Sequence, residues 1–233
     1  MRYRPTLTLL LALSLQSIAF SQDAPPAPGV LNVRSFGATG DGKALDSAAI
    51  NKAIDAAVAK GGGMVFFPAG DYLSTSIRLK SNVSLYLDQG ATIVAADPKD
   101  GHKYDSPEPN ESDQFQDFGH SHWQNSLIWG IGLENVSILG PGRIWGKGLV
   151  RSGNGSRPGT TQPSSSTPTK DGRKPGKFTY PNARDAVEDG WGNKAIALKL
   201  CRNVILKDFT IRKGGHFAIL ATGVDNWTLS GVA

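Results

Sequence analysis

Residues 195–233 read AIALKLCRNVILKDFTIRKGGHFAILATGVDNWTLSGVA, and this stretch contains one short pattern twice. Asn203 and Asn226 each begin a run in which apolar and polar residues alternate, and they lie 23 residues apart. Glycine-containing turns separate the runs. Short strands that recur at a fixed period indicate a solenoid, because one repeat cannot bury its apolar face without stacking on the next. The stretch therefore predicts coils of a parallel β-helix.

The same asparagine phrase occurs earlier in the chain, at Asn82 and Asn135. The larger gaps, of 53 and 68 residues, each contain a polar insertion, near residues 97–124 and 149–192. Long insertions between repeats usually project from one face of a solenoid, often the binding face. We expect the asparagines to lie at turns and to bond neighbouring backbone groups. Three of them form Asn-X-Ser/Thr sequences, which we interpret as products of the repeat and not as glycosylation sites.

One helical pattern precedes the repeats. Residues 47–60 place apolar side chains on one face at helical spacing, and Asp46 or Ser47 can cap the first turn. An open solenoid end would expose apolar side chains and unpaired strand edges, so we expect this helix to cap the first coil. Around it, strands are expected over 30–36, 64–68, 77–80, 83–87 and 91–95, with turns over 37–42 and 69–72.

The N-terminal residues indicate export. Residues 1–21 contain two arginines, an apolar run and small residues before the cleavage position, as in a secretory signal peptide. A Pro-rich lead-in follows over 22–29, and one β-helix domain over 30–233. We therefore expect a secreted or periplasmic protein without a membrane span after signal cleavage. The formal charge of +5 is mild, so we expect neither nucleic acid nor membrane as a partner.

Cysteine and histidine usage makes disulfide and metal chemistry unexpected. Cys201 is the only cysteine, so no intrachain disulfide can form, and its place inside a repeat predicts a buried structural thiol. His120 and His122 are too few for a metal site without a third ligand. We expect no metal and no cofactor.

Several stretches resemble a known family. Residues 32–42 (NVRSFGATGDG) and 61–72 (GGGMVFFPAGDY) resemble the N-terminal cap of the pectate-lyase-like β-helix superfamily. Residues 77–85, the run NVSILGPGRIWGKG from Asn135, and LCRNVILKDFTI from Leu200 resemble glycoside hydrolase family 28, the polygalacturonases. One departure is Ile-Trp-Gly-Lys-Gly at 144–148, where relatives commonly carry Ile-Asp-Gly-Gln-Gly.

The resemblance implies an all-β solenoid, a right-handed single-stranded parallel β-helix with an N-terminal capping α-helix. It also implies inverting hydrolysis of galacturonan-type, acidic plant polysaccharide by aspartates, with no metal. We expect a monomer if the full chain is present. In such hydrolysis one carboxylic acid protonates the leaving oxygen and a carboxylate activates water on the opposite face of the sugar.

The catalytic motifs of that family are missing from this chain. There is no Asn-X-Asp in a strand context, no Asp-Asp pair and no Gly-His-Gly. Arg78-Leu79-Lys80 has an Arg-X-Lys spacing but lies in an early strand, so we reject it as catalytic. We therefore assign no catalytic residue, expect the β-helix to be truncated at its C-terminal end, and expect the catalytic aspartates beyond residue 233.

Two other functions remain open from the sequence. A related β-helix lyase or epimerase would call for a basic residue that takes the C5 proton, often with calcium held by clustered carboxylates. No dense aspartate cluster lies on the repeat strands. A non-catalytic, carbohydrate-binding β-helix is the other alternative.

Four side chains are predicted to bind substrate. His216 can bind sugar hydroxyls or carboxylates, although a turn histidine held by backbone bonds fits as well. Lys194 and Arg184 lie where the second insertion rejoins the repeat and can pair with uronate carboxylates, unless they belong to a solvated loop. Trp123 can stack on a sugar ring or anchor the first insertion.

Overall fold

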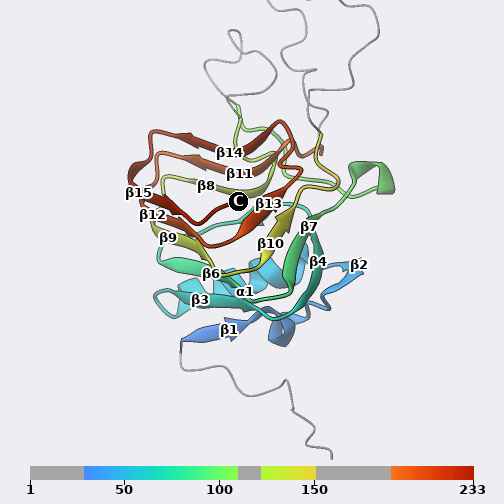
Figure 1. Ribbon diagram of the computed structural model, residues 1–233, viewed down its shortest axis with the longest axis horizontal. Coiled ribbons are helices and arrows are strands. Elements are labelled where there is room, and N and C mark those ends of the chain that lie inside the picture. The colour runs from blue at the N-terminus through green and yellow to red at the C-terminus, as the bar shows by residue number, and fades with distance from the viewer. Residues whose placement is uncertain (1–28, 110–121, 151–189) are drawn as a thin grey trace, which may run out of the picture.

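The computed structural model describes residues 29–109, 122–150 and 190–233, and its strands form three parallel sheets (Figure 1). The six-stranded sheet contains β1 (Val30–Asn32), β3 (Gly63–Phe67), β6 (Val83–Leu87), β9 (Glu134–Leu139), β12 (Arg202–Lys207) and β15 (Asp225–Ser230). The five-stranded sheet contains β2 (Asp41–Leu45), β4 (Gly70–Ser74), β7 (Ala91–Ala95), β10 (Arg143–Trp145) and β13 (Thr210–Arg212). The four-stranded sheet contains β5 (Ile77–Arg78), β8 (Ser126–Ile131), β11 (Lys194–Lys199) and β14 (Phe217–Thr222).

The chain visits the three sheets in a constant order. From β3 onward each coil passes through the six-, the five- and then the four-stranded sheet, and every strand pairs in parallel with its counterpart in the next coil. In Figure 1 the coils stack from β1 at one end to β13, β14 and β15 at the other. The predicted right-handed parallel β-helix is thus confirmed.

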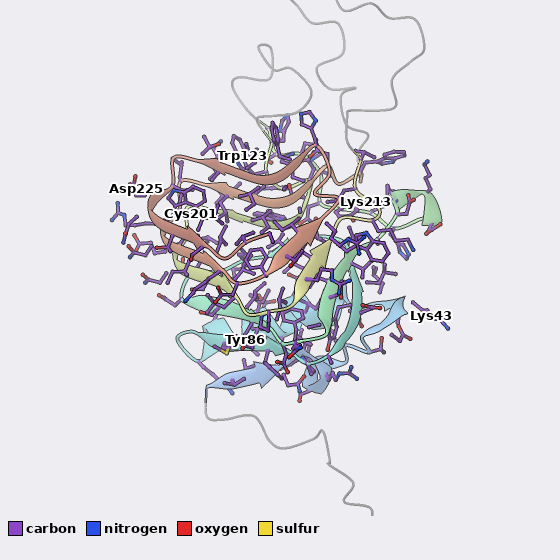
Figure 2. The ribbon with its side chains drawn as sticks, in the orientation of Figure 1. Lys43, Tyr86, Trp123, Cys201, Lys213 and Asp225 are labelled. Carbon is purple, nitrogen blue, oxygen red and sulfur yellow. The ribbon has the colours of Figure 1, made fainter. Side chains whose placement is uncertain are left out.

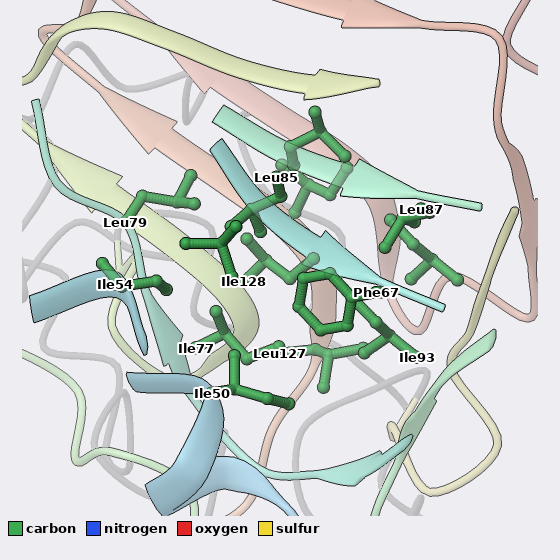
Figure 3. Close-up of a cluster of buried hydrophobic side chains, with 14 of the residues drawn as sticks. Ile50, Ile54, Phe67, Ile77, Leu79, Leu85, Leu87, Ile93, Leu127 and Ile128 are labelled. Carbon is green, nitrogen blue, oxygen red and sulfur yellow. The ribbon is translucent and has the colours of Figure 1, made fainter. Parts of the chain in front are cut away.

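Apolar columns fill the interior of the coils. Leu85, Ile138 and Leu206 are register partners in successive coils, and all three are fully buried. Ile77 and Ile128 begin a second column on the four-stranded sheet. Figure 3 shows Leu85, Ile77 and Ile128 meeting in one cluster, to which Ile138 and Leu206 also belong. Because strand side chains alternate between the two faces, the alternating sequence pattern places every second residue in this core.

The helix α1 (Ser47–Ala59) covers the first coils, as the sequence predicts. Ile50 and Ile54 are fully buried and join the core cluster (Figure 3). Asp46 occupies the N-cap position, but its side chain makes no capping hydrogen bond. Its carboxylate instead accepts from the backbone N–H groups of Thr39 and Gly40, at 2.7 and 3.1 Å. Asp46 therefore holds the preceding turn to the start of the helix.

Three local expectations were wrong over part of their length. The strand expected over 30–36 ends at Asn32, and a 3-10 helix, η1 (Val33–Phe36), follows. The expected turns over 37–42 and 69–72 overlap strands β2 and β4. Gly70 lies so close to the preceding coil that a Cβ there would be 2.8 Å from the Gly40 carbonyl oxygen. Glycine is thus present in β4 because of close stacking between coils, a reason that local sequence does not distinguish from a turn.

The repeated asparagines form a ladder along one corner. Asn82, Asn135, Asn203 and Asn226 have positive φ, between 49° and 63°. Each side-chain amide from Asn135 onward donates to the Oδ1 of the asparagine one coil before, at 2.8, 2.9 and 2.7 Å. Asn82 lies in a turn as predicted, but Asn135, Asn203 and Asn226 are the second residues of strands β9, β12 and β15. Their side-chain amides bond one another and not the neighbouring backbone groups that we expected. Asparagine suits the position because it tolerates left-handed backbone and carries both a donor and an acceptor.

Two substitutions of Asn203 separate its role in the left-handed backbone from its role in the ladder hydrogen bonds. Asn203→Gly keeps the left-handed backbone and removes two ladder hydrogen bonds, so we expect unfolding free energy to fall by about 1–2 kcal/mol. Asn203→Ala should cost about 1 kcal/mol more, because a Cβ without a local hydrogen bond disfavours positive φ. Urea denaturation followed by circular dichroism measures both. Equal stability of the two variants would contradict a backbone role for Asn203.

The last described coil exposes apolar side chains. Trp227 and Leu229 are the register partners of the buried Val204 and Leu206, yet they are 42% and 49% exposed. They lie on β15, an edge strand of its sheet, and β13 and β14 are edge strands of the other two. The apolar columns therefore reach the surface at this end of the coils.

Candidate functional site

Both insertions open at the same corner of the β-helix. The first lies between β7 and β8 and the second between β10 and β11, so each connects the five-stranded sheet to the four-stranded sheet. Their described ends are joined by hydrogen bonds. The backbone N–H of Tyr104 donates to the Gly190 carbonyl at 2.9 Å, and that of Val150 donates to Gly192 at 3.0 Å. Residues far apart in sequence are thus gathered at this corner.

A basic edge lies at this corner, and we define it as Trp145, Lys147, Arg212, Lys213 and His216. Trp145 and Arg212 end β10 and β13 and are register partners, while Lys213 follows β13 directly (Figure 2). Lys147, Arg212 and Lys213 are exposed, and Trp145 and His216 are partly exposed. No salt bridge joins the three exposed cations to a carboxylate among the described residues. The edge therefore presents positive charge beside an aromatic ring.

Two glycines fix the backbone that carries Lys147. A Cβ at Gly146 would lie 1.9 Å from the Lys213 carbonyl oxygen, and one at Gly148 would lie 2.2 Å from the Ala96 carbonyl oxygen. The Gly146 N–H donates to the Arg212 carbonyl oxygen at 2.8 Å, and the Gly148 N–H donates to the Ala95 carbonyl oxygen at 3.1 Å. The Gly-Lys-Gly turn is consequently held against both neighbouring coils.

Three described carboxylates near this corner, those of Asp97, Asp105 and Glu108, are engaged in structural contacts. Asp97 accepts from the Lys99 N–H at the start of the 3-10 helix η2 (Pro98–Asp100). Asp105 binds both Arg78 and the indole N–H of Trp129. Glu108 accepts from backbone N–H groups at 123 and 124. Within the described ranges, no group of three or more metal-ligating side chains is assembled.

Beneath the edge lies a buried polar layer, defined as Asn125, Ser126, Asn193 and Lys194, which are all 0% exposed. The ammonium of Lys194 donates to Asn125 Oδ1 at 3.4 Å and to Asn193 Oδ1. Burial lowers the pKa of Lys194 to about 7, while Glu108 acts in the opposite direction. The side-chain N–H groups of both asparagines and the Ser126 hydroxyl have no hydrogen-bond partner among the described residues. Lys194 is thus an interior residue.

The predicted binding residues have different positions. His216 belongs to the edge, where its backbone N–H donates to the Asn193 carbonyl at 2.7 Å and its ring meets Phe217 edge-on. Lys194 lies in the interior and not in the solvated loop considered as its alternative. Trp123 is 4% exposed, and the Lys199 ammonium lies 4.1 Å from its ring centroid. Its ring is covered, as the anchoring alternative requires. Arg184 lies outside the described residues.

Sequence reasoning did not select Trp145, Lys147 or the two buried asparagines as site residues. Trp145 and Lys147 could have been selected, because they are the two residues at 144–148 that depart from the family pattern. Asn125 and Asn193 precede strands β8 and β11 in equivalent positions, and the Asn193 N–H donates to the Asn125 carbonyl at 3.1 Å. The insertions hide this equivalence, because they separate the two asparagines by 68 residues.

Two other expectations concern Cys201 and membrane spans. Cys201 is 1% exposed, and its thiol lies 3.3 Å from the Lys199 carbonyl oxygen, which confirms the buried thiol. No described helix has the length and apolar character needed to cross a bilayer.

The architecture defines the class of the protein: a parallel β-helix with a capped first coil and a basic edge beside its insertions. Residues 30–138 match the family model described as "Rhamnogalacturonase A/epimerase, pectate lyase-like". Residues 30–138 thus form a pectate-lyase-like domain, and the chain is similar to family 28 exopolygalacturonase in fold and sequence.

Individual relatives refine this placement. Exo-poly-alpha-D-galacturonosidase of Dickeya chrysanthemi is 30% identical over 218 residues, which cover 85% of this chain and 35% of that protein. Mannuronan C5-epimerase AlgE3 of Azotobacter vinelandii is 46% identical over 68 residues, 29% of this chain and 4% of the epimerase. The Family 28 exopolygalacturonase of Yersinia enterocolitica superposes with a TM-score of 0.59 at 26% identity, covering 88% of this chain and 38% of the other. The chain thus spans about a third of the length of its galacturonan-related relatives.

Proposed function

We propose that this chain is the N-terminal portion of a secreted glycoside hydrolase that cleaves pectin-type galacturonan. The observation that carries the proposal is the extent of the matches. In sequence, the exo-galacturonosidase match spans 85% of the chain, whereas the match to the AlgE3 epimerase is confined to 68 residues. The basic edge supports an acidic polysaccharide, because uronate carboxylates form strong, charge-assisted hydrogen bonds with lysine and arginine.

The proposed reaction is inverting hydrolysis, with its acid and base contributed by aspartates beyond residue 233. Asp97, Asp105 and Glu108 are committed to structural contacts, which leaves them poorly suited to proton transfer. A coil that stacked on β13, β14 and β15 would bury Trp227 and Leu229 and would extend the same corner. Aspartates on such a coil would adjoin the basic edge.

Turnover of polygalacturonate tests this proposal. The 233-residue chain is expected to bind polygalacturonate and to release no reducing ends above a no-protein control. A chain that continues past Ala233 with Asn-X-Asp and Asp-Asp motifs is expected to release them. Appreciable release by the 233-residue chain would refute the assignment of the catalytic aspartates to later residues.

A lyase or epimerase is the second possibility, and it has support from the local AlgE3 similarity. Such an enzyme removes the C5 proton and would leave either an unsaturated uronide or an inverted sugar. Absorbance of an unsaturated product, or exchange of the C5 proton with deuterated solvent, would select this function. Binding by extended and unextended chains without any of these products would select a non-catalytic carbohydrate-binding protein.

A further inference from the structure

We propose that Trp145 and Lys147 form a uronate subsite on the basic edge. The indole ring packs against the apolar face of a sugar ring, and the Lys147 ammonium binds the carboxylate of that sugar. The inference rests on the proposed function, since it takes the pectin-type polysaccharide as the ligand. It adds a recognition element at the position where this chain departs from its relatives.

The strand geometry directs Trp145 outward. Ile144 is fully buried, and adjacent residues of a strand point to opposite faces, so Trp145 lies on the outside of the five-stranded sheet. Its register partners are Val94 in one neighbouring coil and Arg212 in the other. The ring therefore lies at the end of β10, next to an exposed guanidinium.

Lys147 is positioned against the same ring. Its ammonium lies 5.6 Å from the Trp145 ring centroid, and the close-packed glycines on either side restrict the backbone that carries it. Attraction between an ammonium and an aromatic ring is weak when both remain exposed to water. A carboxylate ligand can therefore recruit this ammonium without breaking a strong contact.

Comparison with the second lysine–tryptophan pair supports the assignment. Lys199 lies closer to its ring, at 4.1 Å from the Trp123 centroid, and Trp123 is 4% exposed. That pair is packed as part of the structure. Trp145 and Lys147 are looser and more exposed, as a ligand-binding pair must be.

The partly exposed ring of Trp145 is the part of the side chain that a ligand can contact. Its indole N–H is buried and, like that of Trp123, has no hydrogen-bond partner among the described residues, so the N–H does not distinguish the two tryptophans. Sugar sites combine an aromatic surface with a few polar groups that fix orientation, and Trp145 with Lys147 supplies both.

Calorimetric titration of the 233-residue chain tests the subsite with two probes, a galacturonate oligomer and a neutral galactose oligomer of equal length. Trp145→Ala is expected to weaken galacturonate binding about 10-fold, while Trp145→Phe keeps an aromatic face and should change it by less than about threefold. Lys147→Met should weaken galacturonate binding about fivefold and leave neutral-oligomer binding unchanged. Lys43→Met is the matched control, because it removes an exposed lysine on β2, at a distance from the edge (Figure 2).

The outcomes distinguish the subsite from the function on which it rests. Galacturonate binding that is equal in the wild type, Trp145→Ala and Lys147→Met overturns the subsite and leaves the proposed function standing. Absence of galacturonate binding by the wild type overturns both. Circular dichroism and thermal unfolding establish that each variant is folded. If Trp145→Ala does not fold, Lys147→Met still tests the subsite, since methionine nearly matches the volume of lysine, and Trp145→Phe tests it with a smaller aromatic ring.

Discussion

Gly146→Ala is expected to lower the unfolding free energy by at least about 3 kcal/mol, the largest loss that we predict for a single methyl group. The added Cβ would lie 1.9 Å from the Lys213 carbonyl oxygen and 2.8 Å from the Leu149 side chain. Its main obstacle is backbone, which cannot rotate away as a flexible side chain can. The two coils must separate, and the hydrogen bond from the Gly146 N–H to Arg212 would be lost with them.

Gly132→Ala serves as the control for this substitution. Gly132 has a φ of 65° but no atom within 4 Å of an added Cβ. Its cost should be confined to backbone strain of about 1 kcal/mol. Urea denaturation of both variants, followed by circular dichroism, measures the difference. Similar losses at 132 and 146 would show that the contact with Lys213 does not limit the approach of the coils.

Lys194→Met is expected to change the pH dependence of stability more than any other single substitution. The pKa of Lys194 is lowered to about 7 in the folded chain, against about 10.4 in an unfolded one. Below pH 7 both states hold the proton, and the folded state carries the full cost of a buried charge. Between pH 7 and pH 10 the unfolded state holds more protons, so increasing pH stabilises the folded chain. Below pH 7 this contribution is constant.

The measurement compares the unfolding free energies of the wild type and Lys194→Met at several pH values. Their difference should shift in favour of the wild type by roughly 1 kcal/mol per pH unit between pH 7 and pH 10. Lys43→Met removes an exposed lysine and should leave the slope of the wild type unchanged. A pH-independent difference for Lys194→Met would mean that Lys194 keeps its proton in the folded state up to the top of this range.

Local sequence predicted most strands of the coils. It missed strands whose extended conformation depends on pairing with a neighbouring coil. Strands β6 and β7 were predicted with their observed bounds. In β6, alternation over a few residues reports which face is buried, whereas all five residues of β7 are buried. Strand β4 was predicted as a turn, because glycine and aspartate are frequent in turns. Its extended conformation depends on pairing with β7 along its whole length.

The candidate site was predicted less completely. His216 was predicted as a substrate-binding residue from its position in the sequence, and the structure places it on the basic edge. The same reasoning placed Lys194 and Trp123 among substrate-binding residues, but the structure buries both. Burial of a charged side chain depends on residues that surround it from other coils, such as Asn125, which lies 69 residues away in sequence. No local pattern contains that information.

The sequence by itself determined that this protein is a parallel β-helix with a capping helix. Alternation, asparagines with left-handed backbone and an amphipathic helix each have a cause within a few residues. Only the tertiary structure decided that both insertions leave from one corner and that Trp145, Lys147, Arg212 and Lys213 form a single edge. It also decided that Lys194 lies beneath that edge. The physical reason is that a solenoid brings residues together by the stacking of coils, and insertions of unequal length conceal from the sequence which residues stack.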